Sequence, residues 1–359
     1  MNIMDKFKVS VIIPSFNEEK YIEKCINSIL DFEKPLSLET EIIIVDGMST
    51  DNTLNILLHI QNKHDNVFVL RNSSVYQSFA INKALEIAKG KWIMRLDAHS
   101  IYPNNYLKLC LETAERTGAD NVGGLVITLP GGESYQANLV QSLTTHKFGV
   151  GNSGFRTGAK EGPTDTVPYG FFKREIFDKV GLFDERLVRA QDYEFNSRII
   201  ATGGKIWRNP AIQVFYYNQP TLTAFYKKQF FKEAPYNAYL WFLAPYAFTP
   251  RHAITGFFSL GVILGVLFQI VIPWLLYPYV FIMSLYFLLA FFSGIQQAIR
   301  YKKIIHALLL PFCFFLYHFI HGIGVLWGLF KLAIGNAPVQ KMPEPWSGAG
   351  KFRVNPSKF

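Results

Sequence analysis

The sequence predicts an α/β domain, built on a Rossmann-like mixed sheet that is mainly parallel, followed by a helical membrane domain. Strand patterns alternate with amphipathic helical patterns through the first part of the chain, at the spacing of βαβ units. Residues 253–299 contain no Asp, Glu, Lys, Arg or His. That run is long enough for two membrane crossings of about 20 residues each.

The elements follow from hydrophobic periodicity. Buried strands are expected at the following residues: 9–14, 41–45, 67–70, 91–96, 121–129 and 169–174. Helices are expected to begin at an N-cap Asn17 and run to Leu30, and to span the following further residues: about 53–64, 76–88 and 189–202. Because crossover connections make parallel neighbours, helices should cover both faces of the sheet.

Composition fits a membrane protein. Half the residues are hydrophobic and the formal charge is +9, which agrees with the positive-inside bias and with an anionic partner. Residues 1–8 lack the apolar core of a signal peptide, so we expect the first domain in the cytoplasm. Cys25, Cys110 and Cys313 are widely spaced and are interpreted as packing residues. No nucleic-acid-binding motif is present, so no nucleic-acid partner is expected.

Three polar clusters follow predicted strands: Ser15 with Asn17, then Asp46, then Asp97 with His99. The carboxyl ends of parallel strands meet at one edge, so the clusters should converge there. Asp97 and His99 can reach one divalent cation, whereas the alternative for each cluster is a turn or helix cap. No G-x-G-x-x-G follows the first predicted strand and no P-loop occurs, so carboxylates, amides and a metal would have to hold any nucleotide.

Several motifs carry a family resemblance. Residues 9–19 (VSVIIPSFNEE), 44–53 (IVDGMSTDNT) and 95–99 (RLDAH) resemble the successive motifs of family 2 glycosyltransferases with the GT-A fold, over roughly residues 8–215. The Asp-Ala-His variant with Tyr102-Pro103 is similar to the branch that builds bacterial exopolysaccharides such as succinoglycan. The same holds for these segments: 148–152, 165–168 and 191–194.

The resemblance implies a donor site. Pro14, Asn17 and Asp46 would line a uridine pocket, and Asp97 would hold Mg²⁺ or Mn²⁺ against the diphosphate. The expected nucleotide-sugar residues are Pro14, Ser15, Asn17, Glu18, Asp46, Arg95, Asp97 and Arg156; the expected metal residues are Asp97 and His99. Most of the family has a second Asp at His99. A neutral imidazole favours Mn²⁺, and it either ligates the metal, orients Asp97 or hydrogen-bonds a phosphate.

Asp192 is the expected catalytic residue. It lies in the first turn of a predicted helix, where a carboxylate complements the helix dipole or serves as a general base. By resemblance it takes the place of the catalytic Asp of inverting transferases. Gln191 stands where many relatives have Glu, which should make Asp192 easier to ionise. The loop 149–162 is either a plain surface loop or part of the donor and acceptor site, and Arg156 and Arg174 either face a diphosphate or are ordinary surface residues.

The membrane part has three apolar stretches. Residues 222–242 form either a helix in the membrane interface or a linker helix, and residues 229–233 lack the Gln-x-x-Arg-Trp motif of processive synthases. Two crossings are expected at 254–274 and 275–292. Residues 304–330 form a third crossing or a re-entrant segment, in which His318 and His321 either pack between helices or contact a lipid phosphate. Gly322, Gly324 and Gly328 predict close helix approach.

These observations define expected domains and a function. The domains are a catalytic domain at 1–220, an interfacial segment at 221–252, membrane helices at 253–330 and a basic tail at 331–359. We expect a metal-dependent (Mn²⁺ or Mg²⁺), inverting glycosyltransferase, multi-pass in the cell membrane with a cytoplasmic catalytic domain. It would move one sugar from a nucleotide sugar, expected to be UDP-linked, to a polyprenyl-linked saccharide in surface polysaccharide synthesis. The alternatives are a polyprenyl-phosphate glycosyltransferase, a processive polysaccharide synthase and a catalytically silent membrane scaffold.

Overall fold

A computed structural model describes residues 8–33 and 39–341. Contacts divide the described residues into two units, each with its own core. The first unit comprises the described parts of Met1–Ile127 and Gly158–Tyr216. The second comprises Thr128–Thr157 and the described part of Tyr217–Met342. The segment Thr128–Thr157 therefore groups with the C-terminal helices rather than with the sheet that precedes it.

One mixed sheet organises the first unit. Among the described residues its strands run in the order β3-β2-β1-β4-β8-β6-β9-β5, with β7 paired to β9. The strands β1 to β4 are mutually parallel, and β8 joins β4 in the antiparallel direction. The strand bounds are β1 Val9–Ser15, β2 Thr40–Asp46, β3 Val67–Arg71, β4 Trp92–Arg95, β5 Ser100–Ile101, β6 Asn121–Leu129, β7 Gly162–Pro163, β8 Phe171–Lys173 and β9 Ile206–Tyr217. The predicted Rossmann-like mixed sheet is thus confirmed, with β1 to β4 as its parallel part and antiparallel pairings at β5, β7 and β8.

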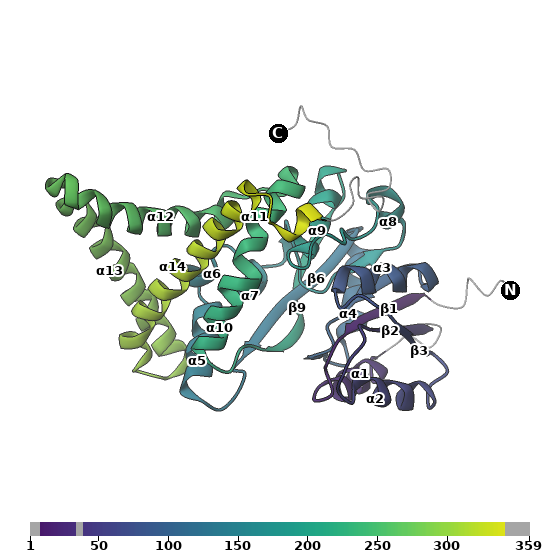
Figure 1. Ribbon diagram of the computed structural model, residues 1–359. Helices are drawn as coiled ribbons and strands as arrows, with labels where there is room; N and C mark the ends of the chain where they lie inside the picture. The colour runs from purple at the N-terminus through teal and green to yellow at the C-terminus, as the bar shows by residue number, and fades with distance from the viewer. Residues whose placement is uncertain (1–7, 34–38, 342–359) are drawn as a thin grey trace. The chain divides into compact units, whose positions relative to one another are not determined.

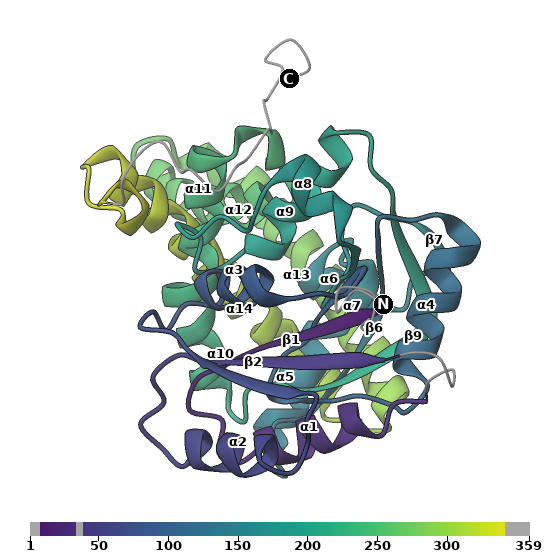
Figure 2. The same cartoon turned by 90° about the vertical axis from the view of Figure 1, so that its right-hand side faces the viewer.

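Helices cover both faces of this sheet. Figure 2 shows α1 and α2 below β1 and β2, with α3, α8 and α9 above. The helices of this unit are α1 Ile22–Leu30, α2 Thr53–Gln61, α3 Gln77–Ile87, α4 Tyr106–Thr117, α8 Glu175–Val180 and α9 Gln191–Ala201. On the upper side a buried core joins Ile12, Ile43 and Ile93 of the strands to Ile81 of α3 and Phe195 of α9. Burial of these apolar side chains fixes where the strands end, and hence where the polar clusters lie.

The first helix begins later than its sequence predicts. Tyr21, not Asn17, occupies the N-cap position of α1. Asn17 instead has a left-handed backbone, with φ 56°, and its side-chain oxygen accepts a hydrogen bond from the Thr50 amide at 2.8 Å. Asn is among the residues that tolerate this conformation. The N-cap prediction is therefore wrong, because Asn17 turns toward the loop after β2.

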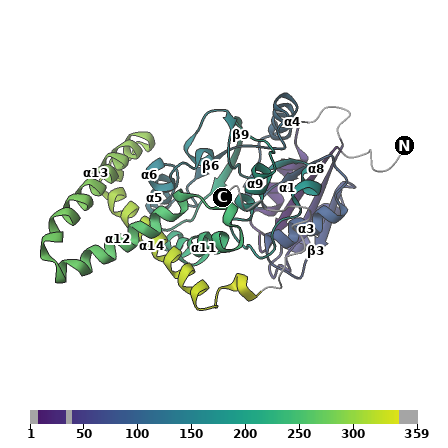
Figure 3. The same ribbon diagram turned by 90° about the horizontal axis from the view of Figure 1, so that it is seen from above.

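The second unit is helical. Its described elements are α5 Tyr135–Thr144, α6 Lys147–Val150, α7 Gly154–Thr157, α10 Leu222–Lys228, the π-helical turn η2 Gln229–Glu233, α11 Ala234–Leu243, η3 Pro245–Ala247, α12 Pro250–Val271, η4 Pro273–Leu275, α13 Leu276–Tyr301, α14 His306–Ala333 and η5 Pro338–Lys341. Three of its stretches are long and apolar enough to cross a membrane: Pro250–Val271, Pro273–Tyr301 and His306–Lys341. The helices α12 and α13 form a V that closes at η4, and α14 joins the two open ends (Figure 1 and Figure 3).

The predicted packing residues of the helical unit find partners. Gly322 lies against Thr255 and Ser259 of α12, so close that a Cβ would overlap the Thr255 carbonyl oxygen. The ring nitrogen Nδ1 of His318 lies 2.8 Å from the Tyr286 hydroxyl, and that of His321 lies 2.9 Å from Thr255 Oγ1. Both imidazoles thus tie α14 to its neighbours, which supports the helix-packing interpretation. The three cysteines are buried and free, as predicted.

Candidate active site

The polar clusters meet at the carboxyl edge of the parallel strands. Strand register pairs Ser15 with Asp46 across β1 and β2, and Ile12 with Arg95 across β1 and β4. Two residues beyond Arg95, Asp97 therefore stands level with the end of β1. Ligands of open α/β sheets bind at this edge.

Hydrogen bonds tie the three loops together. The Asn17 amide donates to Ser49 Oγ at 2.9 Å, and the Glu18 amide donates to Thr53 Oγ1 at 2.8 Å, which links the loops after β1 and β2. His99 Nδ1 lies 2.9 Å from a carboxylate oxygen of Glu18, which adds the loop after β4. Glu18 and His99 thus bond to each other. The donor-site role of Glu18 and the metal role of His99 stay predictions.

Three buried side-chain polar atoms at this edge lack a hydrogen-bond partner among the described residues. They are Oγ of Ser15, Oδ1 of Asp46 and Nε of Arg95, all from side chains almost fully removed from solvent. The other carboxylate oxygen of Asp46 accepts from the Ser49 amide at 3.1 Å. Buried polar groups are seldom left unpaired, so these atoms fit a polar ligand such as a nucleoside. The donor set predicted from Ser15 and Asp46 is consistent with this observation.

Arg95 joins two carboxylates that are far apart in the sequence. Its side chain is 5% exposed and forms ion pairs with Asp97 Oδ1 at 2.8 Å and with Asp192 Oδ2 at 3.4 Å. The guanidinium also lies over the ring of Tyr169, 5.6 Å from its centroid. The structure therefore brings Asp97 and Asp192 to one place, as expected. Arg95 was predicted only as a donor-binding residue, whereas it is positioned as their common counterion.

The environment moves the pKa values of the two acids in opposite directions. Burial raises the pKa of Asp97, but the charge of Arg95, with smaller contributions from His99 and a Gln77 hydrogen bond, lowers it below its usual range. Burial also raises the pKa of Asp192, and here Arg95 offsets the effect only in part, while Asp97 adds to it. Asp192 is thus harder to ionise than an ordinary Asp, because burial outweighs the absence of a charge at Gln191. Two acids with separated pKa values suit two different roles.

Sequence reasoning missed a glutamine. Gln77 is the first residue of α3; its amide nitrogen donates to Asp97 Oδ1 at 3.0 Å, and its amide oxygen accepts from Gln191. Gln77 therefore connects the loop after β4 to the helix that carries Asp192. The only feature of the sequence that could have indicated a site role for Gln77 is its position just past the end of β3, at the same edge as the other clusters. Tyr102 was noted for its position alone, and its hydroxyl bonds to the backbone amide and carbonyl of Asp97.

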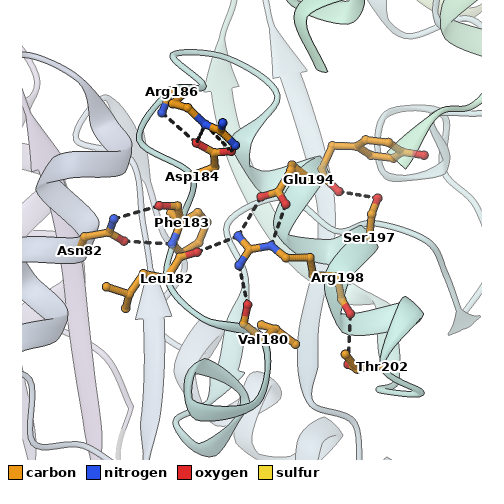
Figure 4. Close-up of polar contacts among 11 residues, drawn as sticks. Asn82, Val180, Leu182, Phe183, Asp184, Arg186, Glu194, Ser197, Arg198 and Thr202 are labelled. Carbon is orange, nitrogen blue, oxygen red and sulfur yellow. Dashed lines mark hydrogen bonds and ion pairs between the residues drawn. The ribbon is translucent and has the colours of Figure 1, made fainter. Parts of the chain in front are cut away.

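A buried ion pair positions α9. Arg198 donates to Glu194 one turn earlier, at 2.7 Å and 2.8 Å, and to the backbone carbonyls of Val180 and Leu182 (Figure 4). Both side chains of the pair are almost completely buried. Asn82 of α3 bonds to both the amide and the carbonyl of Phe183 (Figure 4). These contacts anchor α9 and the loop before it to α3, and so fix the position of Asp192.

Arg174, one of the two arginines considered for a diphosphate, lies away from Asp97. Arg174 donates to the carbonyl oxygens of Ala88 and Gly90, before the start of β4, at the edge opposite to Asp97. The diphosphate interpretation of Arg174 is therefore wrong, since its guanidinium closes the α3–β4 turn. Arg156 lies in α7 of the second unit, so its role in donor binding stays a prediction.

Among the described residues, no three His, Cys, Asp or Glu side chains gather into a complete metal site. The chemistry of the predicted ligands nevertheless suits a divalent cation. Asp97 favours its ionised form, and a carboxylate with an imidazole is a donor set that accepts Mn²⁺ or Mg²⁺. Because a partial set leaves room for oxygens of a diphosphate, a shared metal site is compatible with these residues.

Comparisons with known proteins agree with this geometry. Residues 10–181 match the family described as Glycosyl transferase family 2. The chain is 32% identical over 229 residues to dolichyl N-acetyl-alpha-D-glucosaminyl phosphate 3-beta-D-2,3-diacetamido-2,3-dideoxy-beta-D-glucuronosyltransferase of Methanococcus voltae, covering 61% of this chain and 70% of that protein. It is 31% identical over 222 residues to the succinoglycan biosynthesis protein ExoA of Rhizobium meliloti, covering 61% of this chain and 66% of that protein.

A solved structure shares the fold. The mannosyltransferase PcManGT of Pyrobaculum calidifontis, determined in complex with GDP-Man and Mn²⁺, superposes with a TM-score of 0.55 at 17% identity, covering 89% of this chain and 87% of that one. The fold and site define a membrane-associated glycosyltransferase with a GT-A catalytic domain. The chain belongs to glycosyl transferase family 2.

Proposed function

We propose that the protein is a metal-dependent, inverting glycosyltransferase that moves a single sugar from a nucleotide sugar to a polyprenyl-linked saccharide. The observation that carries this proposal is the pair Asp97 and Asp192, held by Arg95 at the carboxyl edge of the sheet. Asp97 is the metal and diphosphate residue, and Asp192 is the general base. The remaining donor-site assignments are Pro14, Ser15, Asn17, Glu18, Asp46, Arg95 and Arg156, with His99 beside the metal.

The mechanism assigns one task to each acid. A divalent cation bound at Asp97 would neutralise charge that develops on the leaving diphosphate. Asp192 accepts the proton from the acceptor hydroxyl as that oxygen attacks the anomeric carbon. The bond to the diphosphate breaks as the new glycosidic bond forms, so an α-linked donor yields a β-linkage. No covalent enzyme intermediate is required.

The names of two relatives and the long apolar helices support the proposed lipid-linked acceptor and the proposed membrane location. The name of the Methanococcus voltae relative includes a dolichyl-linked sugar phosphate. The Rhizobium meliloti relative is named as a succinoglycan biosynthesis protein. Three helices able to cross a membrane would keep the site near a lipid-linked acceptor. We therefore propose action in surface polysaccharide or glycan synthesis at the cytoplasmic face. A UDP-linked donor is part of the proposal, and GDP-Man, the donor in the complex of the structural neighbour, is the alternative to be tested.

The decisive experiment is a donor and acceptor panel with the purified full chain in lipid. Radiolabelled UDP- and GDP-sugars are offered with Mn²⁺, Mg²⁺ or EDTA, and with either polyprenyl phosphate or a polyprenyl diphosphate disaccharide. We expect transfer of one sugar to the disaccharide, loss of transfer in EDTA, and inversion at the anomeric carbon. Transfer to polyprenyl phosphate alone would contradict the acceptor assignment, and a long polymer would indicate a processive synthase.

Asp192→Asn tests the base directly. This change should lower transfer by at least about 10²–10⁴-fold while donor binding is retained, because the proton acceptor is lost but the donor contacts are not. Asp178→Asn on α8 is the matched control, since Asp178 is an exposed carboxylate outside the site. If the Asp192→Asn enzyme transfers sugar at the wild-type rate, Asp192 is not the base.

A further inference from the structure

The third long apolar helix occupies a distinctive position. The helices α12 and α13 have 22 and 26 residues, which makes them about 33 and 39 Å long, close to the hydrocarbon thickness of a bilayer when tilted. They meet at η4 and spread apart toward their other ends (Figure 1). The helix α14 connects the open ends of the V (Figure 3) and packs on both of its helices, against Gly294 of α13 and against Thr255 and Ser259 of α12.

The first half of α14 packs on elements that precede the membrane hairpin. The His306 ring lies 2.6 Å from the Tyr135 hydroxyl of α5, and the Cys313 carbonyl accepts from the Tyr226 hydroxyl of α10. A buried cluster joins Leu310 and Phe314 of α14 to Leu139, Leu143 and Phe225 of α5 and α10. These partners belong to α5, which has ten residues, and to α10, which continues through η2 into α11 as one helical stretch that carries charged residues.

The second half of α14 also packs on elements that precede the hairpin, namely η2 and α11. Gly324 lies against Phe230 and Ala234, and Gly328 lies against Pro235 and Ala238, all in η2 and α11. Beyond α14, Val339 packs with Tyr239 of α11. The segments α10 and η2 carry charged residues along this flank, namely Lys227, Lys228, Lys232 and Glu233.

Burial separates α14 from the other two helices. In the most apolar window of its segment, 39% of the residues are buried, against 11% and 6% for the segments of α12 and α13. Its remaining surface is apolar and exposed at positions four residues apart: Ile304, Leu308, Phe312 and Leu316. One side of α14 thus rests on protein, while the other continues the exposed apolar surface of the hairpin. Such a surface fits a lipid bilayer.

The charged residues also distinguish the base of the α12–α13 hairpin from its tip. Basic residues cluster at the open ends of the V, in the last turn of α14 and in η5: Arg251, Arg300, Lys302, Lys303, Lys331 and Lys341. The tip has no charge and presents exposed Trp274 and Tyr277, residues that favour the membrane–water interface. If α14 crossed the bilayer, the lysines of α10 and η2 would be drawn toward the hydrocarbon, at about 2.5–3.5 kcal/mol each near its centre.

From these contacts we infer that α14 lies along the membrane surface at the base of the α12–α13 hairpin. Both of its ends are then on one side of the membrane, so the described part of the chain crosses the membrane twice. The basic residues after α14 stand on the same side as the basic α13–α14 turn, which satisfies the positive-inside rule. The bilayer surface is the partner of the exposed stripe that begins at Ile304.

Cysteine labelling in sealed vesicles tests this topology. In a full-length chain with Cys25, Cys110 and Cys313 replaced by alanine, single cysteines are introduced as Glu133→Cys, Asn336→Cys and Tyr277→Cys, all at exposed positions. A membrane-impermeant maleimide is applied to vesicles of each orientation, with detergent-opened vesicles as the full-labelling reference. The substitution Lys351→Cys in the basic tail gives a second reporter beyond α14.

The expected result is that positions 336 and 351 react in the same orientation as position 133, and position 277 reacts in the other. The helix α14 would then have both ends on one side. Labelling of positions 336 and 351 from the side of position 277 would show a third crossing and overturn the inference. The readout is independent of activity and therefore stands apart from the proposed reaction.

Discussion

A single arginine organises the charges of the candidate site. Arg95 contacts Asp97 and Asp192 together, and a buried cation between two carboxylates keeps both from repelling each other. Neither acid belongs to the same strand as Arg95. Asp97 lies beyond the end of β4, and Asp192 lies in α9. The chemistry of either acid therefore depends on the other through Arg95.

Replacing Arg95 should change the pH dependence of transfer. Asp192 must be ionised to accept a proton, so the rate falls as pH drops through its pKa. Arg95 lowers that pKa, and hence Arg95→Gln should move the acidic limb of kcat to higher pH. Arg95→Lys keeps a positive charge and should leave the limb near its wild-type position. An unmoved limb in Arg95→Gln would mean that Arg95 does not act through the charge of Asp192.

At the scale of elements, α3 and α9 act together. The helix α3 supplies Gln77 to Asp97 and Asn82 to the loop before α9, while Arg198 holds α9 to the carbonyls after α8. The position of Asp192 thus depends on contacts between two helices, α3 and α9, that are about a hundred residues apart in the sequence. Loss of the buried ion pair should loosen this arrangement.

Arg198→Met should be strongly destabilising. It leaves the Glu194 carboxylate buried without its counterion, and breaking a buried pair costs about 3–5 kcal/mol. The change should appear as a lower Tm of the full chain in detergent, accompanied by reduced transfer. Arg116→Met removes the exposed pair with Glu161 and should cost about 0–1 kcal/mol. Equal Tm values for the two variants would contradict the structural role of Arg198.

At the scale of the whole molecule, segments remote in sequence build the helical unit. Thr128–Thr157 interrupts the sheet-forming part of the chain and supplies α5, on which α14 packs. Polar side chains of that segment also reach α13: Gln297 donates to the Ser142 carbonyl at 2.6 Å. The packing of the apolar helices therefore involves residues that come between β6 and β7 in the sequence.

Gly322→Ala should disturb this assembly. A Cβ at Gly322 would overlap the Thr255 carbonyl oxygen, so α14 and α12 must move apart, at about 1–3 kcal/mol for an overpacked contact. Gly261→Ala in α12 is the matched control, because nothing lies within 4 Å of a Cβ there. Thermal stability of the two variants in detergent measures the difference. If Gly322→Ala is as stable as Gly261→Ala, the close approach of the helices is not required.

Sequence by itself determined the class of the fold and the main acids of the site. Periodicity placed β1 to β4 and the helices between them, because the apolar side chains of a parallel sheet must be buried. Motif order predicted Asp46, Asp97 and Asp192, and the uncharged run from Ala253 to Ile299 predicted the membrane hairpin. These features are local or short-range, so they can be read without coordinates.

Tertiary structure decided what depends on distant partners. Arg95 as the shared counterion, Gln77 as the link to Gln191, and Arg174 at the opposite edge all follow from contacts across the sheet. Hydropathy left residues 304–330 as a third crossing or a re-entrant segment, since composition does not reveal which face of a helix is covered. The structure packs α14 on α5, α10 and α11 as well as on α12 and α13, and the inferred surface position of α14 rests on that packing.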